Sequence, residues 1–156
     1  MSVTLTKALL SDCEEIYDLQ IKSFKALLDK YQDYDISPGA EKIERTIYRF
    51  KELNYDYYFI CLGDKRIGAV IISSDNSLCK LKQIHILPEY QGYGYAQQAI
   101  LSVEALYPKA AEWELDTIKQ EEKLCYLYEK MGYVRTGKEQ NIKPGMDLVF
   151  YRKSCT

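Results

Sequence analysis

The turn Gln91-Gly92-Tyr93-Gly94-Tyr95-Ala96 is the segment whose residue types most clearly suggest chemistry. It lies between an apolar run ending in Ile86-Leu87-Pro88 and a segment with helical periodicity, so it joins a strand to a helix. Glycines let the backbone turn tightly, and the free amides at a helix start favour an anion. The P-loop motif is absent and Gln97 interrupts the dinucleotide motif, so the turn alone fits either a pyrophosphate site or an ordinary turn.

The elements that must position this turn alternate between strands and helices, which predicts a single domain over residues 1–156 with a mixed α/β sheet. Hydrophobic periodicity predicts strands over residues 3–9, 57–62, 66–73, 78–87, 113–117, 134–139 and 146–152. It predicts helices over about 11–31, 37–50, 93–107 and 124–131.

Short signals mark the helix ends. Ser11 to Glu14 has the pattern of a capping box, and Ser37 is expected to cap a second helix with Pro38 in its first turn. Gly132 is expected to end the last helix in a left-handed conformation.

The strand over residues 78–87 changes its alternation. Its apolar residues stand first at odd positions, Cys79 and Leu81, and then at even positions, Ile84 and Ile86. Because side chains alternate strictly between the faces of a strand, this change predicts either a β-bulge near Lys82-Gln83 or an irregular edge.

The composition argues for a soluble, cytoplasmic protein with no membrane, nucleic-acid or metal partner. The 21 basic and 23 acidic residues leave no positive excess for phosphates, and the longest apolar stretch, residues 69–72, is too short to cross a bilayer. The five cysteines are scattered, and His85 is the only histidine, so neither a disulfide framework nor a zinc site is expected. Most cysteines are expected to be small buried apolar groups.

Two blocks of sequence resemble the GNAT superfamily of N-acetyltransferases. Gln91, Gly94 and Ala96 match its acetyl-CoA signature Gln/Arg-x-x-Gly-x-Gly/Ala in order. The block Leu127-Tyr128-Glu129-Lys130-Met131-Gly132-Tyr133 is similar to the family's Leu-Tyr-Glu-Lys-x-Gly-Phe block, and the order of strands and helices agrees along nearly the whole chain.

The resemblance implies a mostly antiparallel sheet of about seven strands with four helices, splayed between the fourth and fifth strands. It also implies direct transfer of an acetyl group from acetyl-CoA to a primary amine of a small molecule or peptide in a ternary complex, without a metal. The pantetheine arm would pair with the strand ending at Ile86, and the backbone amide there would stabilise the oxyanion. The implied cofactor-binding residues are Ile84, His85, Ile86, Gln91, Gly92, Tyr93, Gly94, Tyr95, Ala96 and Tyr128.

The resemblance also suggests catalytic roles, each with a structural alternative. Tyr128 is similar to the family's general acid, which protonates the departing thiolate, but it shares a helical face with apolar residues that simply pack. Asp116 is the first candidate base, since several relatives carry a carboxylate there, although it also fits a solvated polar face. His85 is the weaker candidate base, because a lone histidine is more often structural.

One position departs from the family pattern, and the acceptor stays unidentified. Glu121 stands where relatives often carry an asparagine that caps the helix and contacts CoA, so this contact is not transferred. Acceptor selection is expected from the first two helices, from the loop around Tyr31, Tyr34 and Asp35, and from residues 55–59, although these aromatic residues also fit a core or rim. The acidic residues at 112, 114 and 116 weakly favour a cationic amine.

Two other hypotheses remain open. One is a catalytically silent acyl-CoA sensor or interaction module, and the other is a mononucleotide-binding α/β protein. The oligomeric state, including a homodimer, the general base and the use of other acyl-CoAs are not determined by the sequence.

Overall fold

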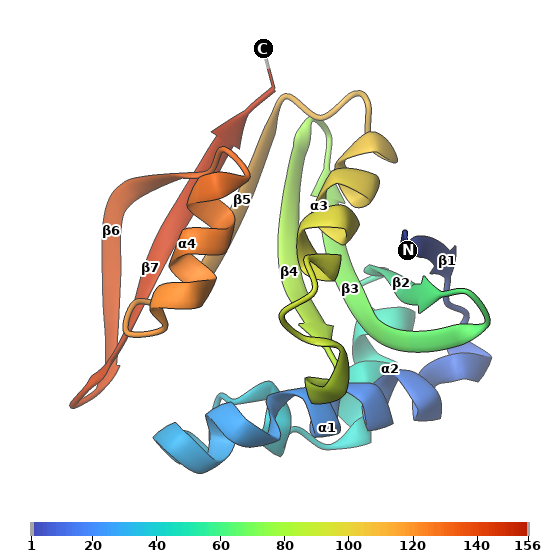
Figure 1. Ribbon diagram of the computed structural model, residues 1–156, viewed down its shortest axis with the longest axis horizontal. Helices are drawn as coiled ribbons and strands as arrows, with labels where there is room; N and C mark the ends of the chain where they lie inside the picture. Colours follow the sequence, from blue (N-terminus) through green and yellow to red (C-terminus); the bar gives the residue numbers. More distant parts are fainter. Residues whose placement is uncertain (1, 156) are drawn as a thin grey trace.

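The computed structural model describes residues 2–155, and its strands form one seven-stranded sheet (Figure 1). The strands are β1 (Thr4–Lys7), β2 (Asp56–Leu62), β3 (Lys65–Asp75), β4 (Leu78–Ile86), β5 (Glu112–Ile118), β6 (Val134–Lys143) and β7 (Met146–Ser154). Their order across the sheet is β1-β2-β3-β4-β5-β7-β6. Neighbouring strands are antiparallel except β4 and β5, which are parallel, so the predicted mixed and mostly antiparallel sheet is confirmed.

Four α-helices cover the two faces of the sheet: α1 (Cys13–Tyr31), α2 (Ile43–Lys51), α3 (Tyr95–Ala105) and α4 (Glu122–Lys130). On one face, Ile16 of α1 packs in a buried cluster with Ala69 of β3. On the other face, Ile100 of α3 and Tyr128 of α4 pack in a cluster with Val70. Because neighbouring residues of β3 point to opposite helix layers, α1 and α2 lie on one side of the sheet and α3 and α4 on the other. Within residues 2–155, no helix has the length and apolar character needed to cross a membrane.

The start of α1 differs from the predicted capping box. A short 3-10 turn over Leu10–Asp12 comes first, and the carboxylate of Asp12 accepts a hydrogen bond from the backbone N–H of Leu9 at 2.8 Å. The capping contact that was expected from the carboxylate of Glu14 is therefore made by Asp12, which stands two residues earlier in the chain. A carboxylate satisfies the free amide in either register, so the local pattern did not fix the first residue of the helix.

The start of α2 is also later than predicted. Ser37 does act as an N-cap, because its hydroxyl accepts a hydrogen bond from Gly39 N–H at 3.1 Å, but the cap belongs to a 3-10 turn over Pro38–Ala40. The chain is extended at Glu41, whose carboxylate pairs with Arg49, and α2 begins only at Ile43. At the other end of the chain, Gly132 adopts the predicted left-handed conformation after α4, with φ of +96°.

The sheet opens between β4 and β5. Their parallel pairing covers only Leu78–Lys80 and Glu112–Glu114. Figure 1 shows the two strands close together at one end and apart at the other, with α1 running across the open end. The predicted splay between the fourth and fifth strands is therefore confirmed.

The predicted β-bulge is also confirmed. Ile71 pairs with Gln83 while the next residue of β3, Ile72, pairs with Leu81, so Lys82 is the inserted residue. A bulge bends its strand and increases the local twist, which helps β4 to turn away from β5 after Lys80.

Candidate active site

The bulge decides which side chains of β4 face which helices. Beyond Lys82, Ile84 and Ile86 pack against apolar residues on the α3 side of the sheet. Gln83 and His85 point to the opposite side, where the ring of His85 contacts the ring of Phe24 on α1 at a centroid distance of 5.5 Å. The prediction that His85 and Ile86 face opposite sides is therefore confirmed.

The glycine turn lies directly after the splayed part of β4. A 3-10 turn over Pro88–Tyr90 leads into it, and the side-chain amide of Gln91 donates a hydrogen bond to the carbonyl of Ile86 at 2.8 Å. Gly92 and Gly94 have φ of +84° and +81°, a conformation that side chains with a Cβ rarely adopt. The motif glutamine thus anchors the turn to the end of β4, and the glycines provide the conformation that opens α3.

The turn leaves room where a ligand's phosphates would lie. Apart from each glycine and its two chain neighbours, no atom of residues 2–155 lies within 4 Å of the position that a Cβ would take at Gly92 or Gly94. The first hydrogen bond of α3 runs from Gln98 N–H to the carbonyl of Gly94 at 3.3 Å, so the preceding amides of the first turn lack intrahelical acceptors. Open space, free amides and the positive end of the helix dipole together fit a pyrophosphate group.

Tyr128 lies on the buried face of α4. Its side chain is 6% exposed and packs against the rings of Tyr133 and Tyr151. Its hydroxyl forms no hydrogen bond with another residue of the described chain. Burial raises the pKa of the phenol, and the charge of Asp116 raises it further, so the group stays protonated throughout the neutral range.

Asp116 lies on β5 with its side chain on the α1 side of the sheet. The neighbouring residues Leu115 and Thr117 are buried on the α3 and α4 side, while Asp116 is exposed. Nearby protein atoms still remove part of its hydration and raise the pKa of its carboxyl, although the charges of Lys82, Lys138 and Lys80 act in the opposite direction. Because the charge of Asp116 also raises the pKa of Tyr128, the two groups interact across the thickness of the sheet.

His85 has properties that do not suit a base. The residue is 5% exposed, and neither ring nitrogen has a hydrogen-bond partner in the described chain. Burial lowers the pKa of the imidazole to about 3, so the ring is neutral and resists protonation. Asp116 is therefore the stronger of the two candidate bases.

Substituting His85 with leucine tests this conclusion. We expect the free energy of unfolding to change by less than about 1 kcal/mol or to rise, because the substitution removes two unpaired buried nitrogens at similar volume. We expect kcat to stay within about threefold of the wild-type value, since general-base catalysis typically contributes at least about 100-fold. Chemical denaturation and steady-state kinetics measure both quantities, and a 100-fold loss of kcat would make His85 the base.

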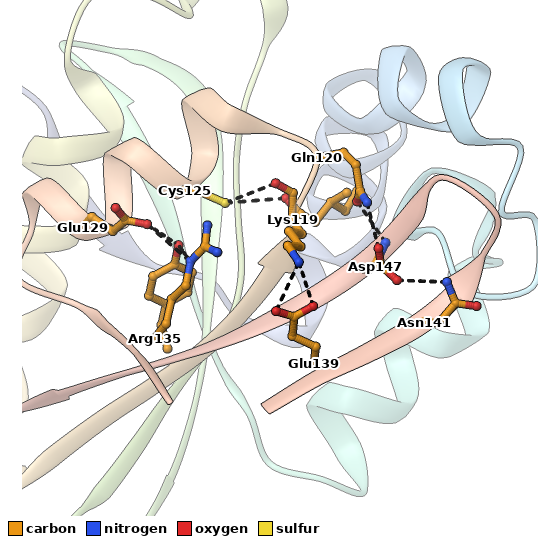
Figure 2. Close-up of polar contacts among 10 residues, drawn as sticks. Lys119, Gln120, Cys125, Glu129, Arg135, Glu139, Asn141 and Asp147 are labelled. Atoms are coloured by element: carbon orange, nitrogen blue, oxygen red, sulfur yellow. Dashed lines mark hydrogen bonds and ion pairs between the residues drawn. The ribbon is translucent and has the colours of Figure 1, made fainter. Parts of the chain in front are cut away.

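A polar network holds the loop between β5 and α4 (Figure 2). Lys119 binds the carboxylate of Glu139 at 2.9 Å, and Gln120 exchanges two hydrogen bonds with Asp147, at 2.8 and 2.9 Å. The thiol of Cys125 contacts the carbonyls of Ile118 and Lys119 at 3.7 Å. These contacts attach the start of α4 to β6 and β7, and so fix the position from which Tyr128 projects.

Other residues that were expected near the acceptor range from fully buried to exposed. Tyr57 and Phe59 are completely buried under α1 and α2, so they belong to the core. Tyr34 is 63% exposed, whereas Tyr55 is half-buried against the core cluster, with its ring 5.9 Å from the ammonium of Lys82. Sequence alone did not separate these aromatic residues, because core and rim positions share the same residue types.

The sequence model of the acetyltransferase (GNAT) family matches residues 13–133, which is most of the chain. The chain belongs to the acetyltransferase (GNAT) family. The match contains the glycine turn, Asp116 and Tyr128, and the predicted resemblance is confirmed. Comparison with curated proteins gives no match.

Solved structures of GNAT acetyltransferases share the fold. The ribosomal-protein-S18-alanine N-acetyltransferase of Escherichia coli superimposes with a TM-score of 0.78 at 14% identity, over 97% of this chain and 93% of the other. The PaiA N-acetyltransferase of Thermoplasma acidophilum in complex with coenzyme A gives 0.70 at 16%, over 99% of both chains. AAC(6')-Ib in complex with ribostamycin and coenzyme A gives 0.75 at 15%, over 99% of this chain and 94% of the other.

Glu121 departs from the asparagine that is common in GNAT members, and the structure shows what the carboxylate contacts instead. One of its oxygens accepts hydrogen bonds from Lys30 at 2.6 Å and from the hydroxyl of Tyr31 at 2.5 Å, both at the end of α1. Sequence reasoning missed this link because the partners are separated by about 90 residues and carry no local signal.

Proposed function

We propose that this GNAT acetyltransferase transfers an acetyl group from acetyl-CoA to a primary amine of a small molecule or peptide, directly and in a ternary complex. The observation that carries the proposal is the open glycine turn at the end of β4, placed where β4 has lost β5 as its partner. The structural neighbours include a complex with ribostamycin and a ribosomal-protein-S18-alanine N-acetyltransferase. The fold is therefore compatible with a small-molecule acceptor and with a peptide acceptor.

The edge of β4 supports binding of the donor's extended arm. After Lys80, β4 has no strand partner on its β5 side in the described chain, so this edge can pair with an added extended segment, apart from the Ile86 carbonyl, which accepts a hydrogen bond from Gln91. The turn at Gly92–Gly94 would hold the pyrophosphate, and the arm would run along β4 toward the bulge. Acetyl-CoA would supply the activated thioester, and a backbone amide near Ile86 would stabilise the developing oxyanion.

Asp116 and Tyr128 would handle the protons from opposite faces of the sheet. Asp116 would accept the proton that the acceptor's ammonium must lose before it can attack. As the new C–N bond forms and the C–S bond breaks, Tyr128 would give its phenolic proton to the departing sulfur and recover the second proton of the amine. Asp116 would then release its proton to solvent, which returns both groups to their starting states. Protonation of Asp116 removes only a smaller cause of the raised pKa of Tyr128, because burial, the largest cause, remains.

Replacing Asp116 with asparagine tests the assignment of the base. We expect kcat to fall by about 100-fold, the lower range for loss of a general base. Since the base must be deprotonated, the wild-type rate should fall as the pH drops through the carboxyl pKa, which burial raises above 3.8. This acid limb should be absent in the variant, as shown by kcat measured across pH.

Glu112→Gln is the matched control, because Glu112 occupies the same face of β5 and its side chain forms no hydrogen bond or ion pair in the described chain. It should retain both kcat and the acid limb. An unchanged pH profile in Asp116→Asn would show that Asp116 is not the base.

Donor and acceptor can be tested separately. Acetyl-CoA should raise the thermal midpoint of the protein, since a ligand that binds the folded state stabilises it, whereas ATP and NAD should not. Amines should then be acetylated when added with acetyl-CoA. Stabilisation by acetyl-CoA without any acetylated product across a broad amine panel would instead support a catalytically silent acyl-CoA-binding module.

A further inference from the structure

The C-terminal end of α1 is joined to the other half of the sheet by three hydrogen bonds. Lys30 and Tyr31 both donate to the carboxylate of Glu121, which precedes α4, and Lys143 at the end of β6 donates to the carbonyl of Tyr31 at 2.7 Å. Within residues 2–155, these are the side-chain hydrogen bonds that join α1 to β5, α4, β6 and β7. They lie where Figure 1 shows α1 crossing the open end of the splay.

Glu121 is the centre of this link and is not an ordinary surface charge. Its side chain is 19% exposed, and Tyr31, which binds it, is 9% exposed. Burial raises the pKa of the Glu121 carboxyl, but hydrogen bonds from Lys30 and Tyr31 lower it by more, so the carboxylate is charged when it accepts them. A partly buried carboxylate that accepts two hydrogen bonds stabilises the contact more than an exposed ion pair does.

The hydrogen bonds to Glu121 hold the helix that covers the Asp116 face of the sheet, where the acceptor is proposed to bind. Seven residues before Tyr31, Phe24 lies against His85 of β4, on the same face of the sheet as Asp116. Fixing the end of α1 to Glu121 therefore sets the distance between α1 and β5 on this face of the sheet. We infer that Glu121 is a positioning residue for the acceptor, which it serves by holding α1 across the open end of the splay. This inference rests on the proposed function.

The proposed role of Glu121 concerns the acceptor and not acetyl-CoA. The glycine turn and the β4 edge proposed to bind acetyl-CoA have no hydrogen bond to Glu121 in the described chain. Loss of the link should therefore weaken acceptor binding and leave donor binding intact. A residue that contacted CoA at this position would give the opposite result.

Steady-state kinetics with Glu121→Ala and Tyr31→Phe test the inference. The second variant keeps Glu121 and removes one hydroxyl, so it guards against a folding defect in the first. We expect the acceptor KM to rise by about fivefold or more in both, the lower end of the range for coupled sites, with the acetyl-CoA KM unchanged within about twofold. Glu122→Ala is the control, because it removes a neighbouring exposed carboxylate of α4 and should change neither constant.

Amide hydrogen exchange provides a readout that does not depend on turnover. Amides of residues 27–32 should exchange faster in Glu121→Ala and Tyr31→Phe than in the wild-type chain or in Glu122→Ala. A rise in the acetyl-CoA KM, unchanged constants or unchanged exchange would each overturn the inference. If the wild-type chain acetylates no amine, the proposed function fails, and the exchange result then decides alone whether Glu121 holds α1.

Discussion

Replacing Tyr128 with phenylalanine is expected to lower kcat by about 100-fold or more, within the range for removal of a general acid. The affinity for acetyl-CoA should change by less than about twofold, because the ring that packs against Tyr133 and Tyr151 is retained. The fold should also be retained, since the hydroxyl has no hydrogen-bond partner in the described chain to lose. Steady-state kinetics and calorimetric titration with acetyl-CoA measure the two effects separately.

Tyr126→Phe is the matched control for this variant. Tyr126 stands two residues earlier on the same helix but is 67% exposed, so removal of its hydroxyl should leave kcat unchanged. If Tyr128→Phe retains full turnover, the departing thiolate obtains its proton elsewhere. If it loses acetyl-CoA affinity in parallel with kcat, Tyr128 serves binding or packing and not proton transfer.

Replacing Gly94 with valine is expected to lower the affinity for acetyl-CoA by about 10- to 100-fold, equivalent to losing one or more hydrogen bonds to a charged group. The added side chain would enter the open space beside the free amides of α3, where the pyrophosphate is proposed to bind. It would also strain the backbone, because φ is +81° and valine is β-branched. Calorimetric titration measures the affinity, and thermal unfolding measures the strain.

Gly145→Val separates strain from lost binding. Gly145 has φ of +82°, has equally open surroundings and lies in the turn between β6 and β7. It should lower the thermal midpoint about as much as Gly94→Val does, yet leave acetyl-CoA affinity unchanged. Equal affinities in Gly94→Val and the wild-type chain would exclude the turn as the phosphate site.

The parts of the fold that the sequence predicts well are those with a local physical cause. The parity change between Leu81 and Ile84 predicted either a bulge near Lys82-Gln83 or an irregular edge, because side chains alternate strictly along a regular strand, and the pairing with β3 shows the bulge. The glycines at 92 and 94 predicted the turn, since few other residues adopt a positive φ. The splay was predicted from the family resemblance, and the bulge inferred from the alternation pattern agreed with it.

The parts that the sequence missed depend on contacts between distant segments. The helix α2 begins later than predicted because Glu41 pairs with Arg49 and accepts a hydrogen bond from Gln20 of α1. The link from Glu121 to Tyr31 depends on how α1 crosses the sheet, which no local pattern encodes. The sequence ranked Asp116 above His85 as a candidate base, but the burial that leaves the imidazole with a lowered pKa arises only in the folded chain.

The most direct test of the proposed function is the stoichiometry of acetyl transfer. The purified chain should be mixed with acetyl-CoA and a panel of small-molecule and peptide amines, with released thiol and acetylated amine quantified by mass spectrometry. Direct transfer predicts one thiol for each N-acetylated product, at a rate that falls by about 100-fold in Tyr128→Phe. Thiol release without an acetylated amine, or no release with any amine despite tight acetyl-CoA binding, would contradict N-acetyl transfer.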